Sequence, residues 1–394
     1  MQNEMQQNIT LKKPRRRIKL PIVIGAVVGA LVLLYITFVF VNIPFVRTLR
    51  DLYIETAMTT ADHQWLATAF IPGSIIDDVM AKRVSNPDII GGLDTEPDAK
   101  ESEPSPETKP DESTPSVTEP AQTEEPADDE PTVTADNIFR LSLEAGDLDY
   151  AGNVIQTYDK EQGLVISHID NGSYKGYVML VDDPSRVYLA PTLYKNEEGM
   201  RIRAMLAEYD AIAGINASGF NDPNDAGHGG DVIGLSCSSG EYWGTYLNYY
   251  GSVVFTEDDK LVVGNLRIWR EHNIRDGIQF GPVLVANGKA QVEGSAGWGV
   301  QPRTAIGQRE DGVVIMLVID GRNLAWSLGC TVGDLAEIML DYGAVNASCC
   351  DGGSSTVLAY DGVVINKNSS LNPAYGRRLP NAFLVKKKTV SESE

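Results

Sequence analysis

The chain has 394 residues, a length that exceeds one ordinary domain and predicts two or three structural units. Its formal net charge at pH 7 is −21, from 33 lysines and arginines against 54 aspartates and glutamates. The acidic excess is concentrated in residues 94–136, where 15 acidic side chains oppose 2 basic ones. Because nucleic-acid binding depends on neutralising phosphates with Lys and Arg, we expect no nucleic-acid partner.

The first recognisable element is residues 21–43, an apolar stretch without a charged side chain. At about 1.5 Å per residue, a helix of this length crosses a hydrocarbon core of about 30 Å. Six basic residues lie just before it, and only Arg47 and Arg50 follow closely. The positive-inside rule then predicts a cytoplasmic tail at residues 1–20 and an extracellular location for everything after the span. We expect a single-pass anchor in the lipid bilayer of the cell membrane; the alternative, a cleaved signal, has a shorter apolar region that ends in small residues.

Residues 44–93 are expected to be helical, because apolar residues recur three and four positions apart. Pro72 and Gly73 interrupt this pattern, and another short helix is expected over residues 75–84. Residues 94–136 are rich in Pro, Glu, Asp, Thr and Ser and poor in apolar residues. Such a segment cannot bury enough surface to offset its ordering entropy, so we expect a disordered stalk that holds the next domain away from the membrane.

Residues 137–388 form the expected globular domain, and residues 389–394 form a short tail. Short β-branched runs recur there between turn signals, which is typical of strands. They are GLVISHI, YKGYVMLV, RVYLAP, AIAGINA, SVVFT, KLVVG, GPVLVANG, RTAIGQ, GVVIMLVI, STVLAYDG, VVIN and NAFLV. Two helices are expected, at residues 197–209 and, between a threonine cap and a glycine stop, at residues 331–342. Many strands with a few helices predict an α+β domain with a mixed β-sheet.

Four stretches place polar residues where expected strands end, which is where binding sites are usually built. They are residues 214–231, residues 301–312, residues 316–331, and residues 347–356 (ASCCDGGSST) with the following residues 375–385. The third contains an Asp-Gly-Arg triplet, and an acid two residues from a guanidinium suits recognition of a charged substrate. Taken singly, each stretch is equally consistent with a surface loop or an ordinary ion pair.

The four cysteines, Cys237, Cys330, Cys349 and Cys350, lie in the part expected outside the cell, where disulfides persist. They form no CxxC pair and have no histidine cluster beside them, so we expect no metal site and no other cofactor. Ring strain disfavours a bond between the adjacent Cys349 and Cys350, so one of them is expected to pair with Cys330 or Cys237. The other two are expected to be buried as small apolar side chains.

In their order along the chain, these motifs resemble the phosphodiester glycosidase domain family. The matching pieces are INASGF (215–220), FGPVLVANGK (280–289), PRTAIGQREDG (302–312), VIDGR (318–322), TVGDLAEIMLDYGA (331–344), DGGSST (351–356) and RLPNAFLV (378–385). They cover most of the globular domain and do not reach the segments before it. One departure is Cys349, which stands where the family usually has an asparagine, two places before the aspartate of its DGG motif.

The resemblance implies hydrolysis of a sugar-1-phosphodiester at the anomeric side, which releases a free sugar and a phosphomonoester. Because a phosphomonoester leaves readily, fixed positive charge on the phosphate matters more than a strong general acid. The implied catalytic residues are Asp320 or Asp351, which would activate water or stabilise the oxocarbenium-like centre, and Arg303 and Arg322, which would contact the phosphate. The implied substrate-binding residues are Asn216, Ser218, His228, Gly352, Gly353, Ser354, Ser355, Thr356, Arg378 and Asn381.

Three interpretations of function remain open at this point. The first is a membrane-anchored extracellular hydrolase that cleaves sugar-1-phosphodiester linkages of a cell-surface glycan or glycopolymer. The second is a non-catalytic glycan-binding or exopolysaccharide-associated envelope module on the same fold, which the missing asparagine at Cys349 favours. The third is a structural envelope protein in which the stalk and the anchor matter most. Release of sugar from a sugar phosphodiester separates the first interpretation from the others.

Overall fold

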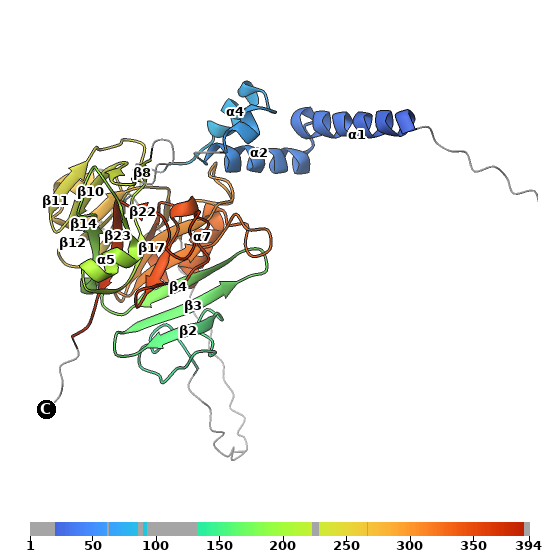
Figure 1. Ribbon diagram of the computed structural model, residues 1–394. Coiled ribbons are helices and arrows are strands. Elements are labelled where there is room, and N and C mark those ends of the chain that lie inside the picture. The colour runs from blue at the N-terminus through green and yellow to red at the C-terminus, as the bar shows by residue number, and fades with distance from the viewer. Residues whose placement is uncertain are drawn as a thin grey trace, which may run out of the picture.

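The computed structural model describes residues 20–60, 63–85, 90–92, 132–222, 228–265 and 267–389. The expected cytoplasmic tail (1–19), most of the expected stalk (93–131) and the last residues (390–394) lie outside the described residues. Strands dominate the described globular part, and helices pack against them (Figure 1). The expected α+β class is therefore confirmed, with antiparallel pairing between the described strands.

Each apolar run expected to be a strand is one in the structure. The helices are α1 (Leu20–Phe40), α2 (Pro44–Met58), α3 (Trp65–Thr68), α4 (Gly73–Met80), α5 (Ile202–Glu208), α6 (Arg267–Glu271) and α7 (Val332–Asp341). The first strands are β1 (Ile90–Gly91), β2 (Val154–Asp159), β3 (Leu164–Asp170), β4 (Lys175–Val181), β5 (Val187–Pro191), β6 (Met200–Arg201), β7 (Ala211–Asn216), β8 (Phe220–Asn221), β9 (Asp231–Val232), β10 (Leu235–Ser238), β11 (Glu241–Gly244) and β12 (Ser252–Thr256). The remaining strands are β13 (Leu261–Gly264), β14 (Ile274–Gln279), β15 (Val283–Ala286), β16 (Lys289–Ala290), β17 (Arg303–Arg309), β18 (Val314–Ile319), β19 (Ala344–Cys350), β20 (Leu358–Tyr360), β21 (Val363–Val364), β22 (Arg378–Leu379) and β23 (Asn381–Lys386).

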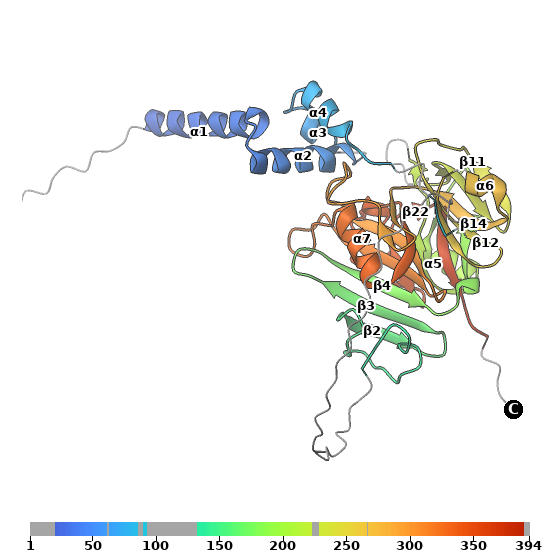
Figure 2. The same cartoon turned by 180° about the vertical axis from the view of Figure 1, so that it is seen from behind.

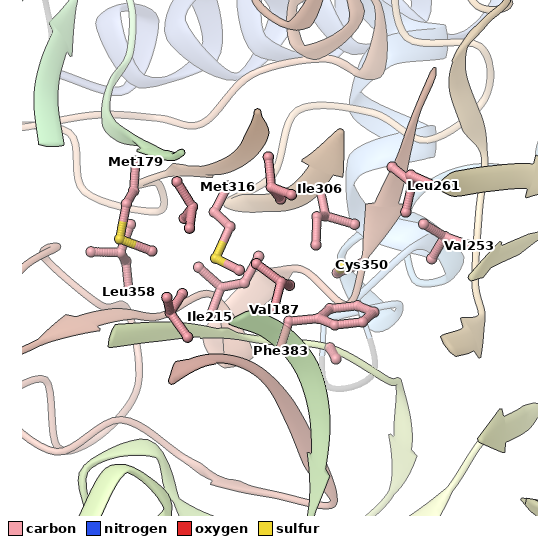
Figure 3. Packing of buried hydrophobic residues seen from close by; sticks show 14 of the residues in the cluster. Met179, Val187, Ile215, Val253, Leu261, Ile306, Met316, Cys350, Leu358 and Phe383 are labelled. Carbon is pink, nitrogen blue, oxygen red and sulfur yellow. The ribbon is translucent and has the colours of Figure 1, made fainter. Parts of the chain in front are cut away.

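Three larger sheets build the domain. The large sheet has eight strands in the order β16-β15-β19-β17-β18-β4-β3-β2. A six-stranded sheet has the order β1-β13-β12-β14-β10-β11, and a five-stranded sheet has the order β21-β20-β7-β23-β5. The main core lies between them and includes Met316 of the large sheet, Val253 of the six-stranded sheet and Phe383 of the five-stranded sheet (Figure 3). A second apolar cluster covers the other face of the large sheet, where Leu335 and Met339 of α7 pack.

Helix α7 begins and ends as the sequence predicts. Thr331 accepts a hydrogen bond from the Asp334 backbone at 3.1 Å, and the Asp334 carboxylate accepts one from the Thr331 backbone at 2.8 Å. This capping box satisfies two backbone donors that the helix itself leaves unpaired. Gly343, with φ of +81°, ends the helix in the left-handed conformation that glycine adopts without strain.

The helix expected at residues 197–209 is shorter than predicted and begins only at Ile202. Residues before it form β6, which pairs with β22 and places Arg201 opposite Arg378. The amphipathic pattern extends over these residues, but a strand 177 positions later in the sequence takes their backbone hydrogen bonds instead. Tertiary pairing has here overridden the local helical period.

The expected disulfide is also absent from the described domain, since all four cysteines are free and buried. Cys349 and Cys350 are neighbours on β19, so their side chains point to opposite faces of the large sheet. Cys350 packs in the main core, where Figure 3 labels it, and Cys349 packs on the α7 side. Burial raises the pKa of the Cys237 thiol to about 11 and that of Cys349 to about 12, so both remain neutral, apolar side chains.

Helix α1 is apolar and long enough to cross a membrane, and most of its surface is not covered by the rest of the chain. Such a helix suits either a membrane anchor or a secretion signal. The following helices α2, α3 and α4, here called the helical segment, enclose an apolar cluster of their own with the end of α1. In both Figure 1 and Figure 2, α1 projects away from the domain, and α2 lies between the end of α1 and the domain.

The helical segment contacts the domain directly. Gln301 Nε2 donates to the Thr56 carbonyl at 2.8 Å, and the Val300 backbone N–H donates to the Thr56 hydroxyl at 3.0 Å. Farther along, Trp298 donates to the Val84 carbonyl at 2.7 Å. Strand β1 then joins the edge of the six-stranded sheet beside β13. The chain therefore reaches the domain before residue 93, and Val133 packs on it again afterwards. The described residues on both sides of positions 93–131 thus contact the same domain, which corrects the role expected for residues 94–136 as a spacer between membrane and domain.

Candidate active site

Antiparallel pairing brings the four polar stretches of the sequence to one end of the large sheet. The start of β17 lies between the ends of two strands, since Arg303 is opposite Ile319 of β18 and Thr304 is opposite Cys350 of β19. Residues that follow β18 and β19 are therefore neighbours, although 31 positions separate Asp320 from Asp351. This edge also receives the end of β7, because Asp351 donates its backbone N–H to the Ala217 carbonyl at 2.9 Å.

The chain turns sharply after β19 in residues 351–356, here called the DGG loop. Its middle forms a short 3₁₀ turn over Gly353–Ser355. A Cβ atom on Gly352 would lie 2.7 Å from the Pro302 carbonyl oxygen, and one on Gly353 would lie 3.0 Å from the Arg322 guanidinium. Gly353 also has a φ of +60° and donates its N–H to Pro302 at 2.9 Å. Both glycines are needed because the loop lies directly against the strand β17 and Arg322.

Asn216, at the end of β7, holds the two ends of the DGG loop together. Its Nδ2 donates to the Asp351 carbonyl at 2.6 Å, and its Oδ1 accepts from the Val357 backbone at 3.0 Å. The Thr304 hydroxyl donates to the same Oδ1 at 2.8 Å. The side chain is fully buried. The structure thus gives Asn216 a positioning role, in contrast to the direct substrate contact that the sequence suggested.

Asp351 has the most unusual electrostatic environment in the loop. Burial raises its pKa to about 6, against the lowering effects of the Ser355 hydroxyl, the Arg377 charge, the Gly352 N–H and the Arg322 charge. A carboxyl group with a pKa near neutrality exchanges a proton readily at physiological pH. Two guanidinium groups beside it provide fixed positive charge for an anionic substrate.

Arg322 belongs to the Asp-Gly-Arg triplet and lies beside Gly353 of the DGG loop. Its φ is +59°, which places its side chain in a direction that a regular strand would not allow. Its Nε and Nη2 donate to Gln301 Oε1 at 3.2 and 2.9 Å. Gln301 in turn donates to the Thr56 carbonyl, so a chain of hydrogen bonds joins the helical segment to this guanidinium.

Arg377 is the functional candidate that the sequence interpretation missed. Its guanidinium lies over the Phe220 ring, 4.8 Å from the centroid, and bonds the Asp222 carboxylate at 2.5 Å and the Ser354 hydroxyl at 3.3 Å. It is also among the charges that lower the pKa of Asp351. The expected residue was its neighbour Arg378, which instead pairs with Glu198. Adjacent residues of an extended chain point in opposite directions, and a sequence alone does not say which one faces the loop.

Asp320 is buried and surrounded by hydrogen-bond donors. Its Oδ2 accepts from the Trp326 indole at 2.9 Å and from the Lys367 backbone at 3.0 Å, and its Oδ1 accepts from the Asn366 amide at 2.9 Å. The Ser327 hydroxyl donates to its carbonyl at 2.5 Å. These bonds join the loop after β18 to the chain after β21. The arrangement suits a structural carboxylate and makes Asp351, of the two expected acids, the better-placed one for chemistry.

Arg303 is buried among backbone carbonyls. Its Nη2 donates to Trp298 and to Gly299, both at 2.8 Å, and its Nε donates to Cys330 at 3.4 Å. Desolvation lowers its pKa from the usual value of an arginine. The guanidinium therefore fixes the loop that contacts the helical segment. Arg303 meets the DGG loop through its backbone beside Gly352, whereas Arg322 meets it through its guanidinium beside Gly353.

The other expected substrate-binding residues divide into three groups. Ser218 and Asn381 are buried and bond each other at 2.9 Å, with Ser236 as a third partner. Ser355 and Thr356 lie inside the DGG loop, and the Thr356 hydroxyl is buried without a hydrogen-bond partner among the described residues. His228 is exposed, and its carbonyl accepts from the Gly199 backbone. Within the described ranges, no three His, Cys, Asp or Glu side chains lie close enough to hold a metal ion.

Comparisons with known proteins support the motif assignment. The family model of the phosphodiester glycosidases matches residues 209–386. The SPbeta prophage-derived uncharacterized protein YomE of Bacillus subtilis is 32% identical over 200 residues, which are 48% of this chain. The match spans only 29% of the length of that relative.

Two solved structures are partly similar in chain trace. The zebrafish N-acetylglucosamine-1-phosphodiester alpha-N-acetylglucosaminidase catalytic domain, auto-inhibited by its pro-peptide, has a TM-score of 0.46 and 18% identity, covering 57% of this chain and 82% of that one. A hypothetical protein from Synechocystis has a TM-score of 0.43 and 16% identity, covering 59% and 64%. Similarity at this level carries no statement about activity. The order of the motifs and the matched family model together show that the chain carries, over residues 209–386, a domain of the phosphodiester glycosidase family.

Proposed function

We propose that the chain hydrolyses a sugar-1-phosphodiester, with the DGG loop as the floor of its active site. The observation that carries this proposal is the position of the Asp351 carboxyl group, which has a pKa of about 6 and lies near the guanidinium groups of Arg322 and Arg377. A phosphodiester carries one negative charge, which two arginines can hold while the sugar carbon beside it reacts. The family of residues 209–386 has the same chemistry in its name.

The proposed reaction breaks the bond between the anomeric carbon and the phosphate oxygen. A water molecule adds its oxygen to the anomeric carbon, and the Asp351 carboxylate accepts a proton from that water. The bonding electron pair leaves with the phosphate oxygen, which becomes a phosphomonoester dianion. Arg322 and Arg377 stabilise the charge that grows on this group, and the Ser354 hydroxyl, next to Arg377, is placed to contact it. The proton on Asp351 then returns to solvent.

We further infer that α1 anchors the enzyme in a membrane, with residues 1–20 in the cytoplasm and the domain outside the cell. Its apolar length and its lack of charge support a span. A packed helical segment directly after α1 supports a retained anchor as well, because the Tyr35 hydroxyl of α1 donates to the Phe70 carbonyl at 2.8 Å. The natural substrate is then a sugar-1-phosphodiester at the cell surface, such as one in a glycan or glycopolymer.

The experiment is a hydrolysis assay of the full chain in detergent, with methyl-phospho-N-acetylglucosamine and other methyl-phospho-sugars as probes. We expect free sugar and methyl phosphate as products. Asp351→Asn should lower kcat by about 10²-fold or more, because the proton acceptor is lost. Asp361→Asn is the matched control, since Asp361 also precedes a glycine but lies exposed in the turn between β20 and β21.

Full activity of Asp351→Asn would contradict the proposed role of this carboxyl group. Sugar binding without any release, by the wild type and across the probe set, would support the non-catalytic glycan-binding interpretation instead. Cleavage between phosphate and methanol, with sugar phosphate as the product, would show a different bond specificity and would also overturn the proposal.

A further inference from the structure

A cavity of about 530 Å³ lies between the helical segment and the domain, next to the candidate active site. Leu49, Leu52, Tyr53 and Leu66 line it from the helical segment, and Val300 and Leu328 line it from the domain. Its walls are therefore mostly apolar. No step of the proposed hydrolysis uses this cavity, and a methyl-phospho-sugar would leave it unfilled.

Gln301 and Arg322 are among the polar residues that line this cavity, together with Thr56, Thr60 and His63. Arg322 is shared by the cavity and the candidate active site, because the residue lines the cavity and its guanidinium lies against Gly353 and near Asp351. The Gln301 side chain holds the guanidinium there with bonds of 3.2 and 2.9 Å. A phosphate on Arg322 would have the sugar site on one side and an apolar cavity on the other.

The helical segment, which supplies one wall of the cavity, also carries exposed aromatic side chains. Phe45 and Phe70 are more than half exposed, and so is Trp65 at the start of α3. Tryptophan is enriched where a protein meets the bilayer interface, and exposed phenylalanines occur on the apolar face of helices that lie in it. Arg50 donates to the carbonyl of Val39 in α1 at 3.0 Å, which fixes α2 at the end of the apolar helix. The cavity therefore lies close to the point where α1 would leave the membrane.

We propose that the cavity binds the single lipid chain of a lipid-linked sugar phosphate, so that the substrate is a sugar joined through its anomeric phosphate to a long-chain alcohol. This inference rests on the proposed hydrolase function and specifies its substrate class. The lipid chain enters between α2 and Leu328, the phosphate lies on Arg322, and the sugar lies over the DGG loop. The products are the free sugar and the alkyl phosphate, which keeps its bond to the lipid chain.

The test compares hydrolysis of decyl-phospho-N-acetylglucosamine and of its methyl analogue by the full chain in detergent. The decyl probe is kept below its own critical micelle concentration. We expect kcat/KM to be at least about tenfold higher for the decyl probe, since burying even two methylene groups has an effect of this size. Leu49→Gln and Leu328→Gln should each lower the decyl-to-methyl ratio several-fold. Leu324→Gln is the matched control, because Leu324 lies on the same loop as Leu328, is 93% exposed and does not line the cavity.

The two proposals fail in distinguishable ways. Equal kcat/KM for both probes, or an unchanged ratio in both cavity variants, would overturn the lipid proposal and leave the hydrolase function intact. If neither probe is hydrolysed, the proposed hydrolase function is wrong. Calorimetry with decyl phosphate then tests on its own whether the cavity binds a lipid chain. Saturable binding that Leu328→Gln weakens and Leu324→Gln does not would support the lipid site, and absence of binding would overturn it.

Discussion

The environment of Asp351 favours proton transfer by its carboxyl group at the expense of the stability of the fold. Burial of the carboxyl group raises its pKa to about 6, and the Ser355 hydroxyl and the two guanidinium groups only partly oppose that effect. The folded protein therefore holds this proton more tightly than the unfolded chain does. As pH rises through about 6 the proton is lost, and so is the stability that it supplied.

Asp351→Asn is accordingly expected to stabilise the protein at neutral pH while it removes activity. The free energy of unfolding should rise by on the order of 1–3 kcal/mol, because at neutral pH the wild type buries an ionised carboxylate and the variant buries an uncharged amide in its place. Urea unfolding of the wild type and the variant would measure it. The difference should disappear below the pKa of an unfolded aspartate, near 3.9. Equal stability at both pH values would contradict this account.

The same pKa predicts how activity depends on pH. Since the proposed base accepts a proton from water only as a carboxylate, kcat/KM for a methyl-phospho-sugar should fall as pH is lowered through about 6. A pH series of initial rates would show this decline. Substitution of Arg377 by glutamine should move the decline to higher pH, because the charge of Arg377 lowers the pKa of Asp351.

The two neighbouring arginines give a matched pair of variants. Arg377→Gln should lower kcat/KM by about 10²–10³-fold, which is the usual effect of removing one charged contact to a transition state. Arg378→Gln should change it less than about threefold, because its exposed ion pair with Glu198 contributes little. Circular dichroism would confirm that both variants fold. The opposite order of effects would restore Arg378 as the substrate contact.

At the scale of elements, hydrogen bonds from buried amide side chains join the polar strand ends to one another. Asn216 on β7 joins Asp351 to Val357, and Asn366 joins Asp320 to Thr356 through its amide. Each buried amide thus ties the DGG loop to another strand. Loss of one amide leaves several buried donors and acceptors unpaired, which costs more than the bonds themselves contribute.

Asn216→Ala should therefore destabilise the protein by about 2–4 kcal/mol and lower activity through the loop. Thermal unfolding would measure the first effect. Asn273→Ala serves as the control, since Asn273 is exposed in the turn before β14 and should change stability by less than about 0.5 kcal/mol. If Asn216→Ala unfolds at the wild-type temperature, the proposed clamp does not hold the loop.

Elements with a clear apolar pattern could be predicted from the sequence, and those defined by distant partners could not. The runs that became β12, β17 and β18 alternate or repeat β-branched residues, which local geometry favours. Strand β19, in contrast, reads AVNASCC, and its pairing with β17 is what makes it a strand. For the site, the motifs identified the DGG loop, but the roles of Asn216, Asp320 and Arg303 depend on hydrogen bonds to residues far away in the sequence. Those bonds could not be predicted from spacing.

At the scale of the whole molecule, the helical segment and the domain behave as one body. Thr56 bonds Gln301, Arg83 lies 3.5 Å from the centre of the Trp298 ring, and β1 joins the six-stranded sheet. The composition of residues 44–93 indicated helices but gave no sign of this contact, because a buried threonine or glutamine is not distinguishable from an exposed one in a sequence. The covalent link through residues 93–131 is therefore not the only connection between the two parts.

A protease site inserted between residues 100 and 120 tests this connection. After cleavage, the fragment that carries α1 to β1 should remain bound to the domain and coelute with it from a size-exclusion column in detergent. Gln301→Leu combined with Thr56→Val should weaken the association, because both remove interface hydrogen bonds. Separation of the wild-type fragments after cleavage would contradict a single body.

The chain contacts the domain both before residue 93 and again at Val133, which has a consequence for the distance between the domain and α1. A tether between an anchor and a domain sets how far the domain can lie from the anchor. Here the chain already contacts the domain before residue 93, so the length of residues 93–131 sets no such distance. If α1 spans a membrane as proposed, the contact between α2 and the domain fixes the height of the DGG loop above the bilayer. Under the proposed anchoring, insertions or deletions in residues 94–131 should leave that height unchanged, because the described residues on both sides of them contact the same domain.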